Sequence, residues 1–265
     1  MKIPLKSDGT GYNIEDLQSD QKETMAYVLD AVRRYSQGLD VNKEKVLRVT
    51  VSGVAGSGKS TWINTLVTAL RKLFPESDCV SVFAPTGSAA YNAGGKTIHG
   101  GFKIPVKFDS LSIGSNAHKF LLKEFMQKLC LIVDERSMMD ATVLGIMKHY
   151  MQMCAHGGVN NGHPWGGIPL IILVGDDFQL PPIMAGAFYA LHQDRLERTQ
   201  ALNLAQLTCR SQGFAEFLEI GRSVLFLEGE KRVNDGQEKF KRILRAIRCE
   251  HETDQMSQED IDTLL

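Results

Sequence analysis

The sequence predicts an α/β fold, in which a doubly wound and mainly parallel sheet carries helices on both faces. Three observations favour this fold. Short runs rich in Val, Ile and Leu alternate with longer segments of helical periodicity. These runs are apolar almost throughout, as expected of strands that are buried on both sides. A glycine-rich loop joins the first of the runs to a helical segment. Strands interleaved with helices in this way are typical of a doubly wound domain.

The elements follow in order along the chain. Five apolar runs are predicted as strands, at residues 46–52, 79–84, 129–133, 169–174 and 223–227. Helical periodicity predicts five helices, at residues 14–36, 59–73, 117–128, 141–153 and 238–248. We therefore expect an N-terminal helical segment, residues 1–45, followed by an α/β domain, residues 46–265.

The composition is that of an ordinary globular protein with a sizeable core, since 43% of the 265 residues are hydrophobic and 23% are charged. No apolar run approaches the ~20 residues of a membrane span, and the N-terminus is not expected to be a secretory signal. The five cysteines are widely spaced and include no C-x-x-C pair. This favours a reducing compartment inside the cell. Thirty basic against 31 acidic residues argue against wholesale coating of nucleic acid but leave local patches open.

The strongest local signal is the loop at residues 53–60, which matches the pattern G-x-x-x-x-G-K-[ST] in full. Its small residues let the backbone wrap closely around a phosphate, so that successive N–H groups and a helix N-terminus point at the anion. Lys59 is expected to reach the β- and γ-phosphates, and Ser60 is expected to offer its hydroxyl to Mg²⁺. The predicted ATP-binding residues of the loop are Gly53, Gly56, Ser57, Gly58, Lys59, Ser60 and Thr61.

Two acids, Asp134 and Glu135, stand at the end of a later apolar run and are candidates for two further functions in ATP hydrolysis. ATP hydrolysis needs a second anchor for Mg²⁺ and a group that orients the attacking water. We expect Asp134 to hold Mg²⁺ through its water shell, and Glu135 to accept a proton from the water or to orient it. Such a pair of acids is common in α/β folds, and it gains weight here from the phosphate loop upstream.

A phosphate loop alone serves kinases, GTPases and motors, so other segments must separate these classes. The guanine-specific pattern N-K-x-D is missing, because residues 42–45 fail it at the last position. Two blocks carry the remaining signal. One is Ala-Pro-Thr-Gly-Ser-Ala-Ala at residues 84–90, with Thr-Ile-His at residues 97–99, and the other is Gly-Asp-Asp-Phe-Gln-Leu-Pro-Pro at residues 175–182.

With these blocks the sequence resembles the PIF family of DNA helicases, in the RecD-like branch of helicase superfamily one. The motifs occur in family order: the Q motif at 17–22, motif I at 53–61, motif Ia at 84–90 with 97–99, motif II at 134–138, motif III at 175–182 and motif IV at 227–235. The resemblance runs from residue 14 to residue 265. It implies a RecA-like P-loop NTPase domain that hydrolyses ATP with Mg²⁺ and moves 5′→3′ on single-stranded DNA or on a tailed duplex.

The resemblance also implies roles for single residues. Gln21 is expected to contact the adenine, Gln179 to sense the γ-phosphate and pass its presence to the DNA, and Arg232 to add charge near the γ-phosphate. For each of the three, a merely structural position remains an alternative. A small wedge insertion is expected near residues 101–117, and DNA repair and recombination are among the roles open to such a helicase.

A DNA track is predicted beside the nucleotide site. Backbone N–H groups and a hydroxyl in the 85–87 block are expected to hold phosphates without reading sequence. Charge and base stacking from the residues that follow would extend the track, in a stretch with six Lys against two acids over residues 94–128. For His99 and Phe102 a position packed in the core remains an alternative. The predicted DNA-binding residues are Pro85, Thr86, Gly87, Lys96, His99 and Phe102.

The sequence departs from the family pattern in three respects. The phosphate loop carries Val54 and Ala55, which is a mild variation. Motif II normally has Ile or Val at its third position, where this chain has Arg136. Nothing after Arg232 resembles motifs V and VI, so the second RecA-like motor domain is expected to lie in a longer protein. Two other functions stay open: a different P-loop phosphotransferase, such as a small-molecule kinase, and a non-catalytic module that binds nucleic acid.

Overall fold

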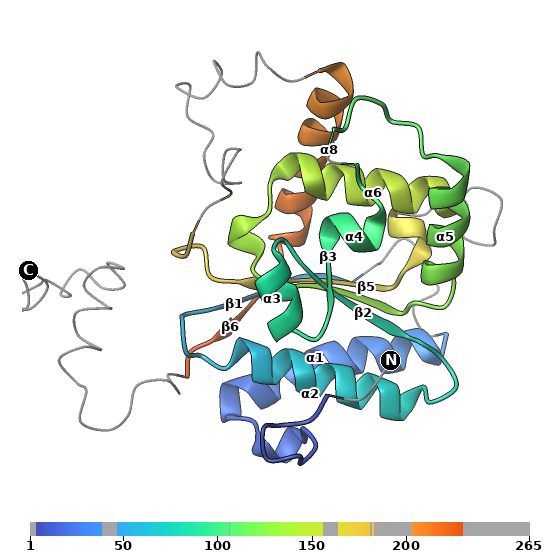
Figure 1. Cartoon of the computed structure of the whole chain (residues 1–265). Coiled ribbons are helices and arrows are strands. Elements are labelled where there is room, and N and C mark those ends of the chain that lie inside the picture. Colours follow the sequence, from blue (N-terminus) through green and yellow to red (C-terminus); the bar gives the residue numbers. More distant parts are fainter. Residues whose placement is uncertain are drawn as a thin grey trace, which may run out of the picture.

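A six-stranded parallel sheet forms the centre of the protein, seen in a computed structural model that describes residues 4–38, 47–105, 107–155, 164–180, 182 and 203–229 (Figure 1). The strand order is β3-β2-β4-β5-β1-β6, and every neighbouring pair is parallel. The strands are β1 (Leu47–Gly53), β2 (Val80–Ala84), β3 (Lys96–Thr97), β4 (Cys130–Val133), β5 (Leu170–Gly175) and β6 (Val224–Leu227). The predicted doubly wound sheet is therefore confirmed, and each of the five predicted strands is present within one residue of its expected bounds.

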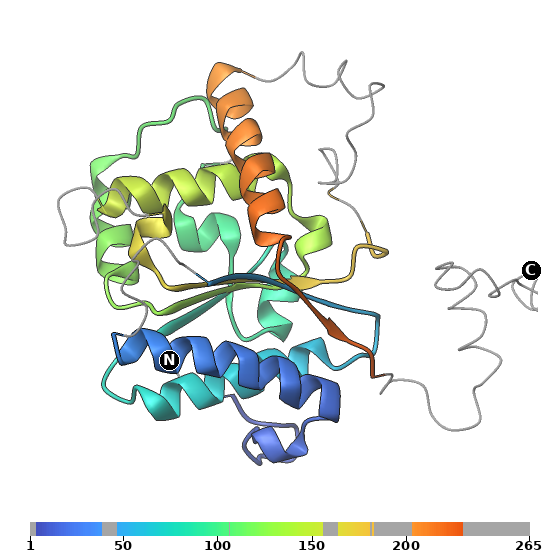
Figure 2. The ribbon, with the colours of Figure 1, turned by 180° about the vertical axis from the view of Figure 1, so that it is seen from behind.

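Helices cover both faces of the sheet, which Figures 1 and 2 show from opposite sides. On one face lie α1 (Ser19–Ser36) and α2 (Lys59–Leu73). On the other lie α4 (Ile98–Phe102), α5 (Ser115–Phe125), α6 (Ala141–Ala155) and α8 (Leu204–Ile220). A short helix α3 (Gly87–Asn92) follows β2, and single 3-10 turns occur at η1 (Ile14–Asp16), η2 (Arg136–Met138) and η3 (Pro164–Gly167).

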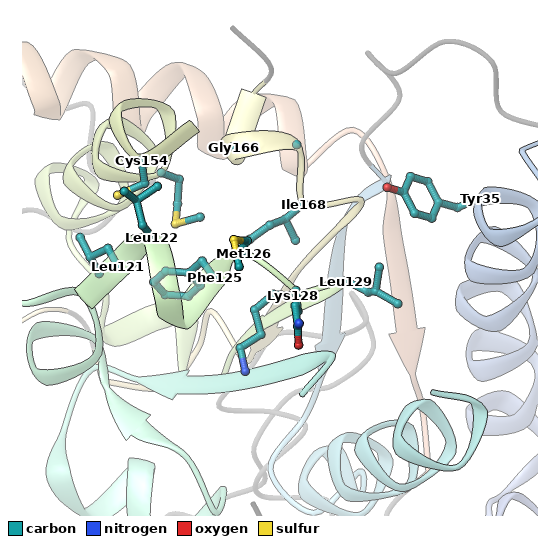
Figure 3. Close-up of a pocket in the computed structure, with 13 residues that line it drawn as sticks. Tyr35, Leu121, Leu122, Phe125, Met126, Lys128, Leu129, Cys154, Gly166 and Ile168 are labelled. Carbon is teal, nitrogen blue, oxygen red and sulfur yellow. The ribbon is translucent and has the colours of Figure 1, made fainter. Parts of the chain in front are cut away.

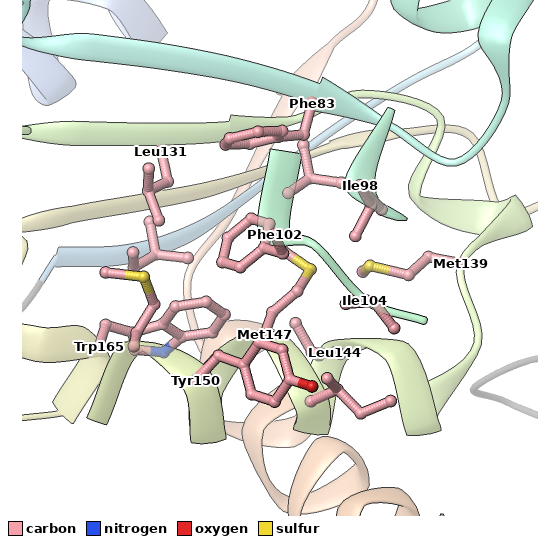
Figure 4. Packing of buried hydrophobic residues seen from close by; sticks show 14 of the residues in the cluster. Phe83, Ile98, Phe102, Ile104, Leu131, Met139, Leu144, Met147, Tyr150 and Trp165 are labelled. Carbon is pink, nitrogen blue, oxygen red and sulfur yellow. The ribbon is translucent and has the colours of Figure 1, made fainter. Parts of the chain in front are cut away.

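The central strands β4 and β5 are buried along their whole length because they contribute to two separate cores. In β4, Leu131 and Val133 belong to the core under α4, α5 and α6, whereas Cys130 and Ile132 belong to the core under α1 and α2. Side chains alternate across a strand, so a sheet covered on both faces needs apolar residues at every position. Figure 4 shows the first of these cores, where Trp165 packs among residues of the sheet and of α6.

The structure differs from the expected helices in two places. The helix predicted at residues 14–36 is interrupted after η1, and α1 begins only at Ser19, where the Gln21 side chain accepts from the Gln18 N–H. Helix α8 was not predicted, because its apolar residues do not gather on one side in the sequence. The predicted helix at residues 238–248 lies outside the described residues.

The segment expected as an insertion, residues 101–117, is anchored to the core in its described part. Ile104 and Phe108 are buried there, at 6% and 5% exposure. The proposed division at residue 45 falls between the described segments 4–38 and 47–105. No helix in the described part of the chain is long and apolar enough to cross a membrane.

Candidate functional site

The carboxyl ends of parallel strands meet at one edge of the sheet, and the candidate site lies at this edge. The loop after β1, the acids after β4 and the turn after β5 all follow neighbouring strands, since β5 pairs with both β1 and β4. A cavity of about 220 Å³ lies between them. The structure thus brings together three segments that the sequence predicted separately. The cavity is lined by Ala55, Gly56, Gly58, Lys59, Ser60, Thr61, Asp134, Glu135 and Gln179.

The loop between β1 and α2 has the backbone that a phosphate cradle requires. Gly56 and Gly58 have φ angles of 94° and 83°, in the left-handed region that glycine adopts without strain. A Cβ on Gly53 would lie 2.4 Å from the Ser57 hydroxyl oxygen, so only glycine fits there. The Lys59 ammonium donates to the carbonyl oxygens of Gly53 and Val54 at 2.7 and 3.1 Å. The cation is therefore held inside the loop, at the N-terminus of α2, where an anion is favoured.

Gln21 lies behind the phosphate loop. It has no exposed surface, its Nε2 donates to the Ser57 carbonyl at 2.6 Å, and its Oε1 accepts from the Gln18 N–H at 3.1 Å. Both ends of the amide are thus used to join the start of α1 to the loop. In this structure Gln21 fixes the shape of the cradle, and its contact with adenine stays a prediction.

The two acids after β4 have unequal environments. Asp134 is only 7% exposed, and burial raises the pKa of its carboxyl to about 6, although the N–H of Glu135 and the cation of Lys59 oppose the rise. The Glu135 N–H donates to Asp134 Oδ1 at 2.9 Å. Glu135 itself has φ 53° and ψ 48°, which is uncommon for a residue with a side chain. A buried carboxylate beside a cation-lined loop is a suitable partner for Mg²⁺.

The turn after β5 is organised by Asp176. Its carboxylate accepts from the Phe178 N–H at 3.2 Å and from Gln179 Nε2 at 3.3 Å, and its carbonyl accepts from the Gln179 N–H at 3.1 Å. These bonds place the Gln179 side chain at the wall of the cavity. The next residue, Asp177, forms an ion pair with Arg136.

The predicted DNA track follows β2, which ends at the same edge. Thr86 caps α3, since its hydroxyl accepts from the Ala89 N–H at 3.2 Å. His99 is exposed, so the alternative of a packed core histidine does not hold. Lys96 is exposed and forms an ion pair with Glu124 at 2.7 Å. The structure therefore leaves His99 exposed along the β2–α4 connection, whereas the Thr86 hydroxyl and the Lys96 ammonium already have partners within the chain.

Phe102 is a correction to that track. It is fully buried, and its ring lies 5.0 Å from the rings of Phe83 and Phe125, centroid to centroid (Figure 4). A ring packed on this core cannot stack on a base. The exposed aromatic residue of this region is instead Tyr91 on α3, at 86% exposure, which the sequence reasoning missed. The available signal was its position directly after the first block of motif Ia, residues 84–90. The predicted site residue Arg232 lies outside the described residues.

A larger cavity, of about 350 Å³, lies between α5, α6, η3 and the end of α1, away from the phosphate loop (Figure 3). Its walls are mainly apolar, and the side chains include Tyr35, Phe125 and Ile168. The ammonium of Lys128 on its wall is already paired with Asp78. A triphosphate needs several N–H donors and a cation, so the smaller cavity suits a nucleotide better than this one.

Together, the parallel sheet, the glycine loop at the end of β1 and the acids at the end of β4 define the class of P-loop nucleotide-binding domains. Within that class, the model of one family, described as PIF1-like helicase, matches residues 16–204. The chain belongs to the PIF1-like helicase family.

Several characterised relatives are similar in sequence over about half of this chain. The ATP-dependent DNA helicase RRM3 of Saccharomyces cerevisiae is 35% identical over 143 residues, which are 53% of this chain and 19% of RRM3. The ATP-dependent DNA helicase PIF1 of Emericella nidulans is 32% identical over 154 residues, 54% of this chain and 19% of that protein. The matched part is thus about a fifth of each relative.

Solved structures show the same fold. The crystal structure of Bacteroides Pif1 bound to single-stranded DNA superposes with a TM-score of 0.61 and 23% identity, covering 94% of this chain and 49% of that one. The Pif1 helicase from Candida albicans gives 0.59 and 23%, covering 87% and 44%. This chain therefore spans about half the length of the solved helicases that it resembles.

Proposed function

We propose that this chain is the first motor domain of an ATP-dependent DNA helicase, which binds and hydrolyses MgATP and contacts single-stranded DNA. One observation carries the proposal: a single cavity is lined by Lys59, Asp134, Glu135 and Gln179, which come from three separate strand ends. The names of the relatives agree with it, since RRM3 and PIF1 are ATP-dependent DNA helicases. Bacteroides Pif1 has also been solved with ADP-AlF3 and single-stranded DNA.

In this proposal the phosphates enter along the N-terminus of α2. The Lys59 ammonium leaves the carbonyls of Gly53 and Val54 and turns to the β- and γ-phosphates, exchanging neutral acceptors for anionic ones. Ser60 and Asp134 would hold Mg²⁺, which would supply positive charge beside the phosphate oxygens. The remaining members of the nucleotide set are Gln21, Gly53, Gly56, Ser57, Gly58 and Thr61.

Hydrolysis then needs an oriented water and a charge at the γ-phosphate. Glu135 orients the water and takes its proton, and Gln179 senses the γ-phosphate from the turn after β5. Arg232, together with a second motor domain, supplies further positive charge. Such charges are worth factors of ~10³–10⁵ in related NTPases, so the chain alone is a weak ATPase.

The DNA path in this proposal crosses the β2–α4 connection, at Pro85, Thr86, Gly87, Lys96 and His99. Movement is 5′→3′ on a single strand or a tailed duplex, with the segment at 101–117 near the fork. DNA repair and recombination are the processes that such a motor serves. A nuclear or mitochondrial location agrees with the fungal relatives.

An ATPase assay of the purified chain, with and without single-stranded DNA, tests this function. We expect slow hydrolysis that DNA stimulates. Lys59→Ala should abolish it, while Lys72→Ala, an exposed lysine on the same helix, should leave it unchanged. Glu135→Gln should retain nucleotide binding in calorimetry but lose phosphate release.

The two alternatives give different results in the same assay. Phosphate transfer to a small acceptor without any effect of DNA would indicate another phosphotransferase. DNA binding with no turnover in any form of the chain would indicate a non-catalytic module. Undiminished hydrolysis by Lys59→Ala would contradict the proposed site itself.

A further inference from the structure

Arg136 is a buried arginine directly beside the proposed water-orienting residue. Only 5% of its side chain is exposed, and its guanidinium is paired with Asp177, whose side chain is 43% exposed. The two residues are 41 positions apart and lie on the turns after β4 and β5. The pair therefore joins the turn that carries Glu135 to the turn that carries Gln179.

The backbone at Glu135 needs such an anchor. Its left-handed conformation is strained for a residue with a side chain, and such a conformation persists only where the surroundings fix it. On the N-terminal side, Asp134 accepts the Glu135 N–H. On the C-terminal side, Arg136 is held by Asp177. The strained residue is thus clamped from both sides.

Close packing at Gly175 makes this clamp specific. A Cβ on Gly175 would lie 2.7 Å from Arg136 Cγ and 2.9 Å from the Arg136 backbone nitrogen. The arginine stem therefore lies directly on the last residue of β5, with no room for a side chain between them. Because of this contact, a displacement of one turn also displaces the other.

On the other side of the pair, Asp177 lies between Asp176 and Gln179 in one tight turn. Asp176 accepts hydrogen bonds from the Phe178 N–H, the Gln179 N–H and the Gln179 side-chain amide. These three bonds hold the turn together. Holding Asp177 fixes this unit against the sheet. The position of Gln179 at the cavity then depends on Arg136.

We propose that Arg136 is a positioning residue, whose ion pair with Asp177 sets Glu135 and Gln179 relative to each other across the nucleotide cavity. The part that Glu135 and Gln179 play rests on the proposed function, whereas the mechanical link does not. The PIF pattern has Ile or Val at this position, so the clamp distinguishes this chain from that pattern. It would couple the sensing of the γ-phosphate to the orientation of the attacking water.

Hydrogen exchange on the unliganded chain tests the link without any activity. Arg136→Met should speed exchange at least threefold in peptides covering 176–180, and Asp177→Asn should do so in peptides covering 134–139. The matched control is Lys128→Met, which breaks another pair of a buried cation and a half-exposed carboxylate, with side chains 1% and 54% exposed. It should leave both peptides unchanged. Faster exchange only in the segment that carries the substitution would overturn the proposal.

Kinetics tests what the link does. We expect Arg136→Met and Asp177→Asn each to lower the kcat of DNA-stimulated hydrolysis at least tenfold, with KM for ATP within about twofold. The double variant should be no slower than either single one, because both remove the same interaction. Arg136→Lys, which keeps the cation, should recover most of the rate. Additive losses, or a rise in KM alone, would contradict the positioning role.

The two tests separate the failure of each proposal. If the unaltered chain hydrolyses no ATP, the proposed function fails, and hydrogen exchange still decides whether the link exists. If the chain is active and the exchange effects are absent, the link fails and the function stands. A loss of activity in Lys128→Met equal to that in Arg136→Met would show a general effect on stability and would also overturn the positioning role.

Discussion

At the scale of single residues, burial alters the protonation of Asp134, the proposed Mg²⁺ ligand. Its carboxyl is almost buried, and its pKa is raised to about 6 by loss of solvation. The protonated form is therefore favoured by folding. The stabilising effect is complete below the unfolded value of 3.8 and is lost as the pH rises through about 6. At neutral pH an ionised Asp134 destabilises the unliganded fold, and a bound cation would remove this cost.

A pH series tests this reading. Asp134→Asn should raise the melting temperature of the unliganded chain at pH 7.5 and have little effect at pH 4, because the amide carries no charge and still accepts the Glu135 N–H. The rise in the pKa of Asp134 from 3.8 to about 6 corresponds to about 3 kcal/mol in the free energy of unfolding. Calorimetry with MgADP should show affinity rising between pH 5 and 7 in the unaltered chain. The same pH dependence in Asp134→Asn would contradict the assignment of Asp134.

At the scale of elements, helices α6 and α8 approach each other so closely that there is no room for a side chain where they cross. A Cβ on Gly145 would lie 1.8 Å from the Cys209 carbonyl oxygen, and a Cβ on Gly213 would lie 1.8 Å from the Ala141 carbonyl oxygen. Each helix therefore offers a glycine to the backbone of the other. This contact explains why α8 packs on α6 although its apolar residues form no clear stripe.

Gly145→Ala should accordingly destabilise the fold. The methyl group meets backbone, which cannot move aside cheaply, so a cost of about 1–3 kcal/mol or more is expected. Thermal unfolding should show a fall in melting temperature of several degrees. Gly114→Ala is the matched control, since nothing lies within 4 Å of a Cβ there. An unchanged melting temperature for Gly145→Ala would show that the two helices are further apart.

The connection from β2 to α4 carries the DNA prediction. Thr86→Ala with His99→Ala should weaken binding of single-stranded DNA in a fluorescence titration, without changing nucleotide affinity in the absence of DNA. Thr86 also caps α3, and such a cap contributes about 1 kcal/mol to stability. Thr86→Ser, which keeps the hydroxyl, is therefore the control for folding. Affinity should fall steeply with salt, because phosphates are the ligands. Binding that is insensitive to salt would contradict the track.

At the scale of the whole molecule, the chain covers 49% of the length of Bacteroides Pif1. Its described part forms one sheet with one candidate nucleotide cavity. Moving along a strand needs two alternating contacts with the DNA, and the proposed track on this sheet would supply one. We therefore expect the 265-residue chain by itself to bind nucleotide and DNA but not to separate a 5′-tailed duplex at saturating ATP. Strand displacement by the purified chain, in the absence of any other helicase, would refute the single-motor reading.

The sequence by itself determined the strands and the phosphate loop. A strand buried on both faces must be apolar at every position, and the loop requires glycine at particular backbone angles, so both leave a local record. The acids after β4 were found for the same reason, since they follow directly on such a strand. These signals depend only on neighbours along the chain.

The tertiary structure decided what depends on neighbours in space. Whether a ring such as Phe102 faces DNA or the core is set by which helix covers it, and here it packs on Phe83 and Phe125. The Arg136–Asp177 pair joins residues 41 positions apart, because β5 lies between β1 and β4 in the sheet. Strand order leaves no local pattern, since central strands such as β4 and β5 are buried on both faces and either would fit beside any other. Only the folded sheet places the two turns side by side.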